Sequence, residues 1–124
     1  MDVQKMPEVG DFMYSSWGYD QTNIEFYKVV RVSDASVWLQ EWESKIVKQT
    51  GWASEEVVAG DGPKVSWHWE RDEQGNQSRS KPVTAGVFRK KWHGDGYWSY
   101  IVSMNSYANA YKWDGKPKYA SHYA

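Results

Sequence analysis

The chain has 124 residues, and its 15 Lys and Arg nearly balance its 16 Asp and Glu, which leaves a net charge near −1. This length fits one domain, residues 1–124, and argues against two. Cysteine is absent, which excludes a disulfide framework, a thiolate metal site and a cysteine nucleophile. The balanced charge predicts no strong binding to duplex DNA and little attraction to an anionic membrane.

The sequence also limits location and chemistry. No apolar run approaches the roughly 20 residues that span a membrane, and residues 1–11 lack the apolar stretch of a signal peptide. We therefore expect a cytoplasmic protein without a membrane partner. The three histidines have no metal-ligand spacing, and no nucleophile elbow or phosphate-binding loop is present. We expect no metal and no cofactor, and a binding protein is favoured over an enzyme.

Aromatic and β-branched residues dominate the apolar part of the sequence. Nine Trp, nine Tyr and three Phe accompany a single leucine, Leu39. These residue types suit a pleated, half-buried surface, whereas helical bundles rely on leucine. We therefore predict an all-β fold.

Strand signals follow one another along the chain. The expected strands, in order, are residues 9–14, 24–32, 37–47, 56–59, 65–69, 87–92 and 97–104. Turns are expected at residues 33–36, 61–63, 93–96 and just after Trp113. The strands at 24–32 and 37–47 indicate a hairpin. Residues 70–82 contain no large apolar side chain, and we predict a mobile loop or hairpin tip there.

These strands favour a single small β-barrel or rolled sheet, because closing the sheet hides edges that aromatic strands would otherwise expose. The order of hairpin, long polar mid-chain loop and hairpin is compatible with an SH3-like barrel. Alternation along the 24–32 strand places on one face Phe26, Val30 and Val32. Alternation along the 97–104 strand places on one face Trp98, Tyr100, Val102 and Met104.

The segment after the first predicted strand combines aromatic rings with hydrogen-bonding side chains. Its candidate ligand-binding residues are Trp17, Tyr19, Asp20, Gln21, Thr22 and Asn23. Such a loop can stack on a planar ligand and read its edge through hydrogen bonds. The alternative is a polar loop whose side chains bond its own backbone.

A second segment of similar character lies near the C-terminus. Its candidate ligand-binding residues are Asn105, Ser106, Tyr107 and Trp113. A barrel can bring this segment beside the first, and the alternative is that its aromatic residues belong to the core. On the 87–92 strand, Arg89 and Lys90 are predicted to contact phosphate; the alternative is a solvated strand edge.

Two stretches near the ends of the chain have distinctive wording, namely residues 9–32, which contain SWGYDQTN, and residues 101–107 together with 111–117. These stretches resemble a family of small proteins encoded by bacteriophages and mobile elements. The resemblance implies a phage accessory protein that acts in the host cytoplasm, and anti-defence proteins are one class of such factors.

Two functions remain open. The first is a binding protein for a nucleotide-type ligand, either a cyclic or signalling nucleotide or a single-stranded nucleic acid, held in an aromatic and amide pocket. The alternative is a protein–protein interaction module that inhibits a host defence enzyme through an aromatic surface. Either protein is expected to be a monomer or a small homo-oligomer. A carbohydrate-binding module and an enzyme are less favoured.

Overall fold

The computed structural model describes residues 6–18, 21–94, 100–105 and 108–121, and within them the fold is all-β, as predicted. The strands are β1 (Phe12–Trp17), β2 (Asn23–Val32), β3 (Ser36–Gly51), β4 (Ser54–Pro63), β5 (Val65–Arg71), β6 (Gln77–Thr84), β7 (Val87–Gly94), β8 (Tyr100–Asn105), β9 (Ala108–Lys112) and β10 (Lys118–Ser121). The described residues contain no helix that could cross a bilayer.

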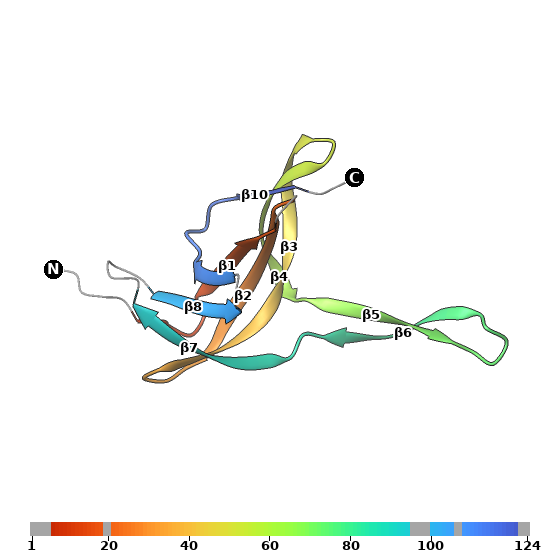
Figure 1. The fold of residues 1–124 in the computed structure, drawn as a ribbon, viewed down its shortest axis with the longest axis horizontal. Coiled ribbons are helices and arrows are strands. Elements are labelled where there is room, and N and C mark those ends of the chain that lie inside the picture. The colour runs from red at the N-terminus through yellow and green to blue at the C-terminus, as the bar shows by residue number, and fades with distance from the viewer. Residues whose placement is uncertain (1–5, 19–20, 95–99, 106–107, 122–124) are drawn as a thin grey trace.

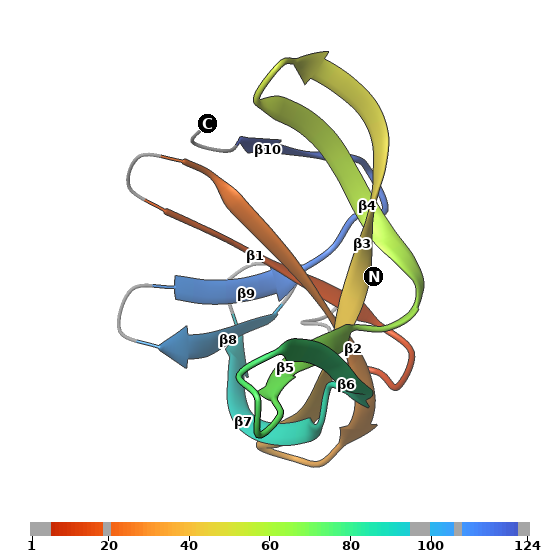
Figure 2. The same cartoon turned by 90° about the vertical axis from the view of Figure 1, so that its right-hand side faces the viewer.

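Eight strands form one antiparallel sheet in the order β10-β4-β3-β2-β1-β9-β8-β7. The first part of β3 pairs with β7 as well as with β2, so the chain of pairings returns from β7 to β3. Figure 2 shows these strands curling around one another, with β4 and β10 along one side. A large antiparallel sheet is therefore present, and β5 and β6 form a separate two-stranded sheet.

The predicted hairpin of the first half of the chain is confirmed, because β2 and β3 pair antiparallel from Phe26↔Trp42 to Val32↔Val37. A bulge between Val29 and Arg31 interrupts the register. A bulge adds one residue to a strand and so shifts its alternation. Val32 therefore packs against the same core as Val29, whereas alternation alone placed it on the face of Phe26.

The inner side of the curled sheet holds the larger core. This first core consists of the buried residues Met13, Tyr27, Val29, Val37, Leu39, Tyr100, Val102 and Ala110. Half-buried Phe88, Trp92 and Met104 pack against it. The predicted shared face of Tyr100, Val102 and Met104 is confirmed, and Trp98 lies outside the described residues.

A second core lies on the opposite side of β1 and β2. It consists of buried Phe26, Val57 and Ala120, with half-buried Tyr14, Ile24, Trp42, Ala59 and Trp113 packed against them. Strands β4 and β10 supply Val57 and Ala120, and β10 is joined to the start of β2 by the hydrogen bond from Ser121 N to Thr22 O. Because successive side chains of a strand point to opposite faces, one pair of strands serves both cores.

Of the two alternatives predicted for residues 70–82, a mobile loop or a hairpin tip, the structure matches the hairpin tip over a shorter range. Most of this segment belongs to the β5–β6 hairpin, which projects away from the rest of the molecule in Figure 1. Only residues 72–76 form the tip, where Asp72 Oδ1 accepts hydrogen bonds from the backbone N–H groups of Gln74 and Asn76. Backbone pairing does not require apolar side chains, so low hydrophobicity misled the prediction of the range. The turn expected at residues 61–63 is wrong, since these residues end β4.

Candidate ligand-binding site

The candidate site begins where β2 separates from β3. The last ladder pair between these strands is Phe26↔Trp42, and the preceding β2 residues, Asn23–Glu25, pair with β1 instead. From Trp42 onward, β3 pairs with β4, with an irregularity between Trp42 and Ser44. The separation leaves open space beside Glu25, and three hollows adjoin this residue.

The first hollow is a cavity of about 310 Å³, here called the Trp17–Asn105 cavity. Its lining residues are Ser15, Trp17, Glu25, Tyr27, Met104, Asn105 and Ala108. Trp17 and Asn105 come from the two segments singled out in the sequence, and the fold brings them together because β1 pairs with β9, which in turn pairs with β8. The expected meeting of these two segments therefore holds for these two residues.

The second hollow is a cavity of about 250 Å³, here called the Thr22–Lys64 cavity. Its lining residues are Trp17, Thr22, Asn23, Ile24, Glu25, Ser44, Glu55, Val57, Lys64 and Ala120. A third, smaller hollow beside it includes Glu41 and Glu43 in its lining. Trp17 and Glu25 line both larger cavities, so this pair is the centre of the candidate site.

Hydrogen bonds orient the central pair. Glu25 Oε1 accepts a hydrogen bond from Trp17 Nε1, and Glu25 Oε2 accepts one from the Tyr27 hydroxyl at 3.4 Å. Burial, together with the neighbouring charges of Glu25 and Glu41, raises the pKa of Tyr27, so its hydroxyl remains a donor. The Trp17 indole is thus held in a defined position before any ligand arrives.

A second carboxylate lies next to Glu25. Burial raises the pKa of Glu41, and the nearby Glu25 adds to this rise, whereas Lys64 opposes it through an ion pair of 3.2 Å. Glu41 is directly opposite Tyr27 in the β2–β3 ladder. The Thr22–Lys64 cavity and the smaller hollow beside it therefore hold several carboxylates, and Lys64 supplies the opposite charge.

The raised pKa of Glu41 predicts a pH dependence of stability. The folded state binds the Glu41 proton more tightly than the unfolded chain, so this contribution is complete below the ordinary pKa of 4.5 and is lost as the pH rises through the raised value. We expect the stability of Glu41→Gln, relative to the unsubstituted protein, to increase from pH 4.5 to pH 7 in urea unfolding. Glu56→Gln, on β4 outside these hollows, is the control. A stability difference that does not vary with pH would contradict this assignment.

Ser15 is the most unusual polar residue of the site. Its side chain is only 2% exposed, and its hydroxyl has no hydrogen-bond partner among the described residues. A buried polar group without a partner costs about 1–3 kcal/mol. Ser15 lines the Trp17–Asn105 cavity, so a bound ligand could supply the missing partner.

The remaining residues of the SWGYDQTN segment bond mainly to the protein itself. Gln21 Nε2 donates to Asn23 Oδ1 at 3.3 Å, and Asn23 Nδ2 donates to the Trp17 carbonyl at 3.4 Å. Thr22 N donates to Ser121 Oγ at 2.9 Å. Thr22 and Asn23 line the Thr22–Lys64 cavity, whereas Gln21 lines none of the three hollows described. Tyr19 and Asp20 lie outside the described residues, as do Ser106 and Tyr107 of the second segment.

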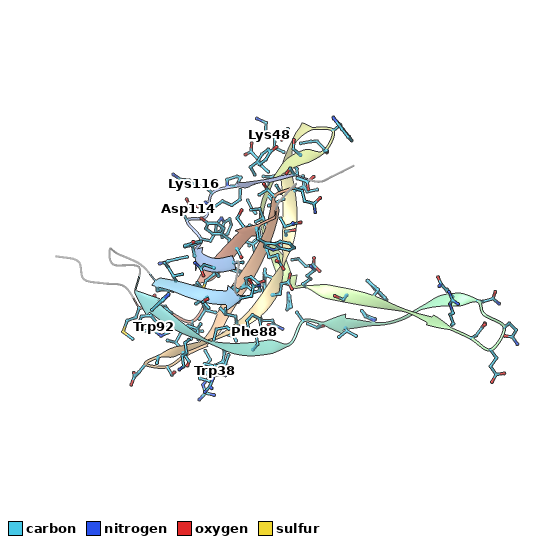
Figure 3. All side chains as sticks on the ribbon, in the orientation of Figure 1. Trp38, Lys48, Phe88, Trp92, Asp114 and Lys116 are labelled. Carbon is cyan, nitrogen blue, oxygen red and sulfur yellow. The ribbon has the colours of Figure 1, made fainter. Side chains whose placement is uncertain are left out.

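Trp113 does not join Trp17. Its ring makes edge contacts with Phe12 at 6.2 Å and Phe26 at 5.1 Å, within the second core. Phe12 and Phe26 lie on the strand faces opposite those of Met13 and Tyr27, which belong to the first core. The turn predicted after Trp113 is marked in Figure 3 by Asp114 and Lys116. Trp113 therefore matches the alternative reading, a core aromatic.

The two predicted phosphate contacts differ in position. Arg89 is exposed and lines none of the three hollows described. Lys90 is half-buried and stands in the sequence of β7 midway between Phe88 and Trp92. Figure 3 labels these two aromatic residues. Lys90 Nζ donates to the Met104 carbonyl at 3.1 Å, and Met104 lines the Trp17–Asn105 cavity. Lys90 thus reaches the strand end that carries Asn105, and Arg89 does not take part in this contact.

The position directly after Trp17 requires glycine. Gly18 has φ of +137°, and a Cβ at this position would collide with the backbone oxygen of Gln21. We expect Gly18→Ala to lower the free energy of unfolding by about 2–3 kcal/mol, measured by urea unfolding. Gly75 has φ of +86° with open space around it, so Gly75→Ala is the matched control, with an expected loss of about 1 kcal/mol. Equal losses at both positions would contradict the collision.

Sequence reasoning missed Ser15, Glu25, Tyr27 and Glu41 as site residues. One signal was available for Glu25, because alternation places it on the same strand face as Tyr27 and Val29, where a charge is unusual.

Comparison with protein-family models, curated proteins and solved structures finds no match to this chain. Within the described ranges, no group of three or more His, Cys, Asp or Glu side chains is arranged to hold a metal ion. The functional argument therefore depends on the geometry around Trp17 and Glu25.

Proposed function

We propose that the protein binds a small ligand of nucleotide type, with the planar base against Trp17 in the Trp17–Asn105 cavity. The observation that carries this proposal is an indole held by Glu25 at the wall of a cavity of about 310 Å³. Small-ligand sites are concave, largely preformed and supplied with a few converging polar groups. Stacking on an aromatic ring contributes about 1–3 kcal/mol per base. Glu25 and Asn105 are in position to read the base edge.

The phosphate end of the ligand lies outside the cavity in this proposal. The described lining residues include the carboxylate of Glu25 and no basic side chain, so a phosphate inside would be repelled. Lys90, at the Met104 carbonyl, is the basic group that we assign to the phosphate end. As part of the proposal we assign the protein an accessory role in the host cytoplasm, such as sequestering a nucleotide signal, which is the role that a resemblance to phage proteins would imply.

Native mass spectrometry of the protein purified from the cells that produce it tests this function. We expect a mass increment of nucleotide size that disappears on denaturation. An unliganded protein is then titrated with a panel of nucleosides, mononucleotides and cyclic nucleotides, monitored by tryptophan fluorescence and calorimetry. Failure of the whole panel to bind would contradict the proposal.

A second candidate function is a protein–protein interaction module. It is favoured by the β5–β6 hairpin, where apolar side chains are exposed on a projecting two-stranded sheet. Val65 and Trp67 are 38% and 46% exposed, and Val83 on the partner strand is 48% exposed. Co-purification of one host protein, lost in the Trp67→Ser and Val83→Ser double variant, would support this function over the first.

We also propose that the strands whose pairings return to β3 form a small barrel of SH3-like type. The pairing of residues 36–40 of β3 with β7 supports this arrangement. Slow hydrogen exchange of the backbone amides in this β3–β7 ladder is the expected result. Rapid exchange in the β3–β7 ladder, combined with slow exchange in the β2–β3 ladder, would contradict the barrel.

A further inference from the structure

We propose that the Trp17–Asn105 cavity selects a guanine-type base over an adenine-type base. This inference rests on the proposed function, because it concerns which base the same cavity accepts. The relevant difference is the pattern of hydrogen-bonding groups on the base edge. Guanine presents two neighbouring N–H donors beside a carbonyl oxygen, whereas adenine presents an amino donor beside a ring nitrogen that accepts.

Glu25 supplies the acceptors that this selection needs. A carboxylate is an acceptor with two oxygens and about four lone-pair positions. In the described structure Oε1 receives the Trp17 indole N–H and Oε2 receives the Tyr27 hydroxyl. Glu41 also forms a hydrogen bond with Glu25, which requires a protonated Glu41 carboxyl as the donor. When Glu41 is ionised, each Glu25 oxygen therefore retains a free lone pair for the ligand. Two parallel N–H donors match two carboxylate oxygens, as in the bidentate pairing of arginine with carboxylates. The adenine ring nitrogen, itself an acceptor, would face the negative charge.

Ser15 supplies the complementary donor. Its hydroxyl is buried, lines the same cavity as Glu25 and has no partner among the described residues. The two residues lie directly opposite each other in the β1–β2 ladder, Ser15↔Glu25. A hydroxyl can rotate to donate, and the carbonyl of a guanine-type base is the acceptor that stands next to its N–H donors. The Ser15 hydroxyl thus faces the carbonyl acceptor of that edge, and the neighbouring Glu25 carboxylate faces its N–H donors.

Stacking on Trp17 and hydrogen bonds to the base edge have different consequences: stacking contributes affinity, and the hydrogen bonds contribute selectivity. Stacking on Trp17 is tolerant, because every base has a flat aromatic face. Selectivity must therefore come from the edge, where a site built to hydrogen bond a ligand strongly disfavours an analogue that leaves buried polar groups unpaired. The charged group in the described lining is the Glu25 carboxylate, which accepts hydrogen bonds, and no basic side chain is present there to donate them. The cavity therefore favours a ligand edge that donates hydrogen bonds.

Free nucleosides test the inference, because they carry no phosphate. Guanosine, inosine and adenosine are titrated against the full chain by calorimetry and tryptophan fluorescence. We expect guanosine to bind at least about tenfold more tightly than adenosine, with inosine, which lacks the exocyclic amino group, in between. Equal binding of guanosine and adenosine would overturn the selectivity and leave the proposed function standing. Failure of all nucleosides and nucleotides to bind would overturn both.

Two variants assign the effect to the named side chains. Glu25→Gln keeps an oxygen for the Trp17 indole but loses the charge and one acceptor, and we expect guanosine binding to weaken about tenfold or more. Glu56→Gln makes the same charge change on β4 outside the cavity lining and should leave binding unchanged. Ser15→Ala should weaken guanosine binding while the protein unfolds at the same or a higher urea concentration. Unchanged guanosine affinity in both site variants would overturn the assignment.

Discussion

Replacing Phe26 by alanine is expected to lower the free energy of unfolding by about 3–5 kcal/mol, the usual cost of removing a large buried aromatic ring. Phe26 is completely buried and is the central residue of the second core. Its ring contacts Trp113 edge-on at 5.1 Å, and it packs with Val57 and Ala120 from β4 and β10. The substitution therefore leaves a cavity where three segments of the chain meet.

Urea unfolding monitored by circular dichroism measures this loss. A small domain has about 5–15 kcal/mol of total stability, so Phe26→Ala removes a large share of it. Phe26→Leu retains most of the apolar contact and should lose about 1–2 kcal/mol, which keeps the comparison readable if the alanine variant does not fold. Trp52→Ala is the control, since Trp52 is 84% exposed and its loss should change stability by about 0.5 kcal/mol at most. Similar losses for Phe26 and Trp52 would contradict the second core.

Trp17→Ala is expected to cause the largest loss of ligand binding, by about 10- to 100-fold. The indole provides the flat wall of the Trp17–Asn105 cavity, and its N–H bond to Glu25 fixes its position. Removing the ring takes away the stacking surface and leaves Glu25 Oε1 without its indole donor. Because Trp17 is half-buried near the end of β1, we expect a smaller effect on stability than on binding.

A second substitution separates the ring from its N–H group. Trp17→Phe keeps an aromatic surface but cannot donate to Glu25, so we expect binding between that of the original protein and Trp17→Ala. Calorimetric titration with the best ligand of the nucleotide panel measures the affinities. Trp113→Phe, a matched change at an aromatic of the second core, should leave the affinity unchanged. Full binding by Trp17→Ala would place the ligand elsewhere.

Local pattern was enough to predict much of the sheet. Alternation correctly identified the inward face of β8, with Tyr100, Val102 and Met104 against the first core. It misassigned Val32, because the bulge between Val29 and Arg31 shifts the phase and leaves no mark in the hydrophobic pattern. Strands β9 and β10 were not predicted, since their short runs contain small or polar residues that signal no strand by themselves.

The sequence predicted the types of residue that form the site better than it predicted which individual residues belong to it. Trp17 and Asn105 were predicted and share a cavity, whereas Trp113, predicted with them, packs in the second core. An aromatic residue suits a ligand surface and a core equally well. Which role it takes depends on the strand face it occupies and on what covers that face, and neither follows from its neighbours along the chain.

The sequence by itself determined the all-β class, the central hairpin and the two segments richest in stacking and hydrogen-bonding groups. The tertiary structure alone decided that β2 leaves β3 at Phe26, which opens the space beside Glu25. It also brought Trp17 and Asn105 to one cavity through the ladders of β1, β9 and β8. The physical reason is that alternation and composition act within a strand, whereas these features depend on ladders between strands that are distant in the sequence.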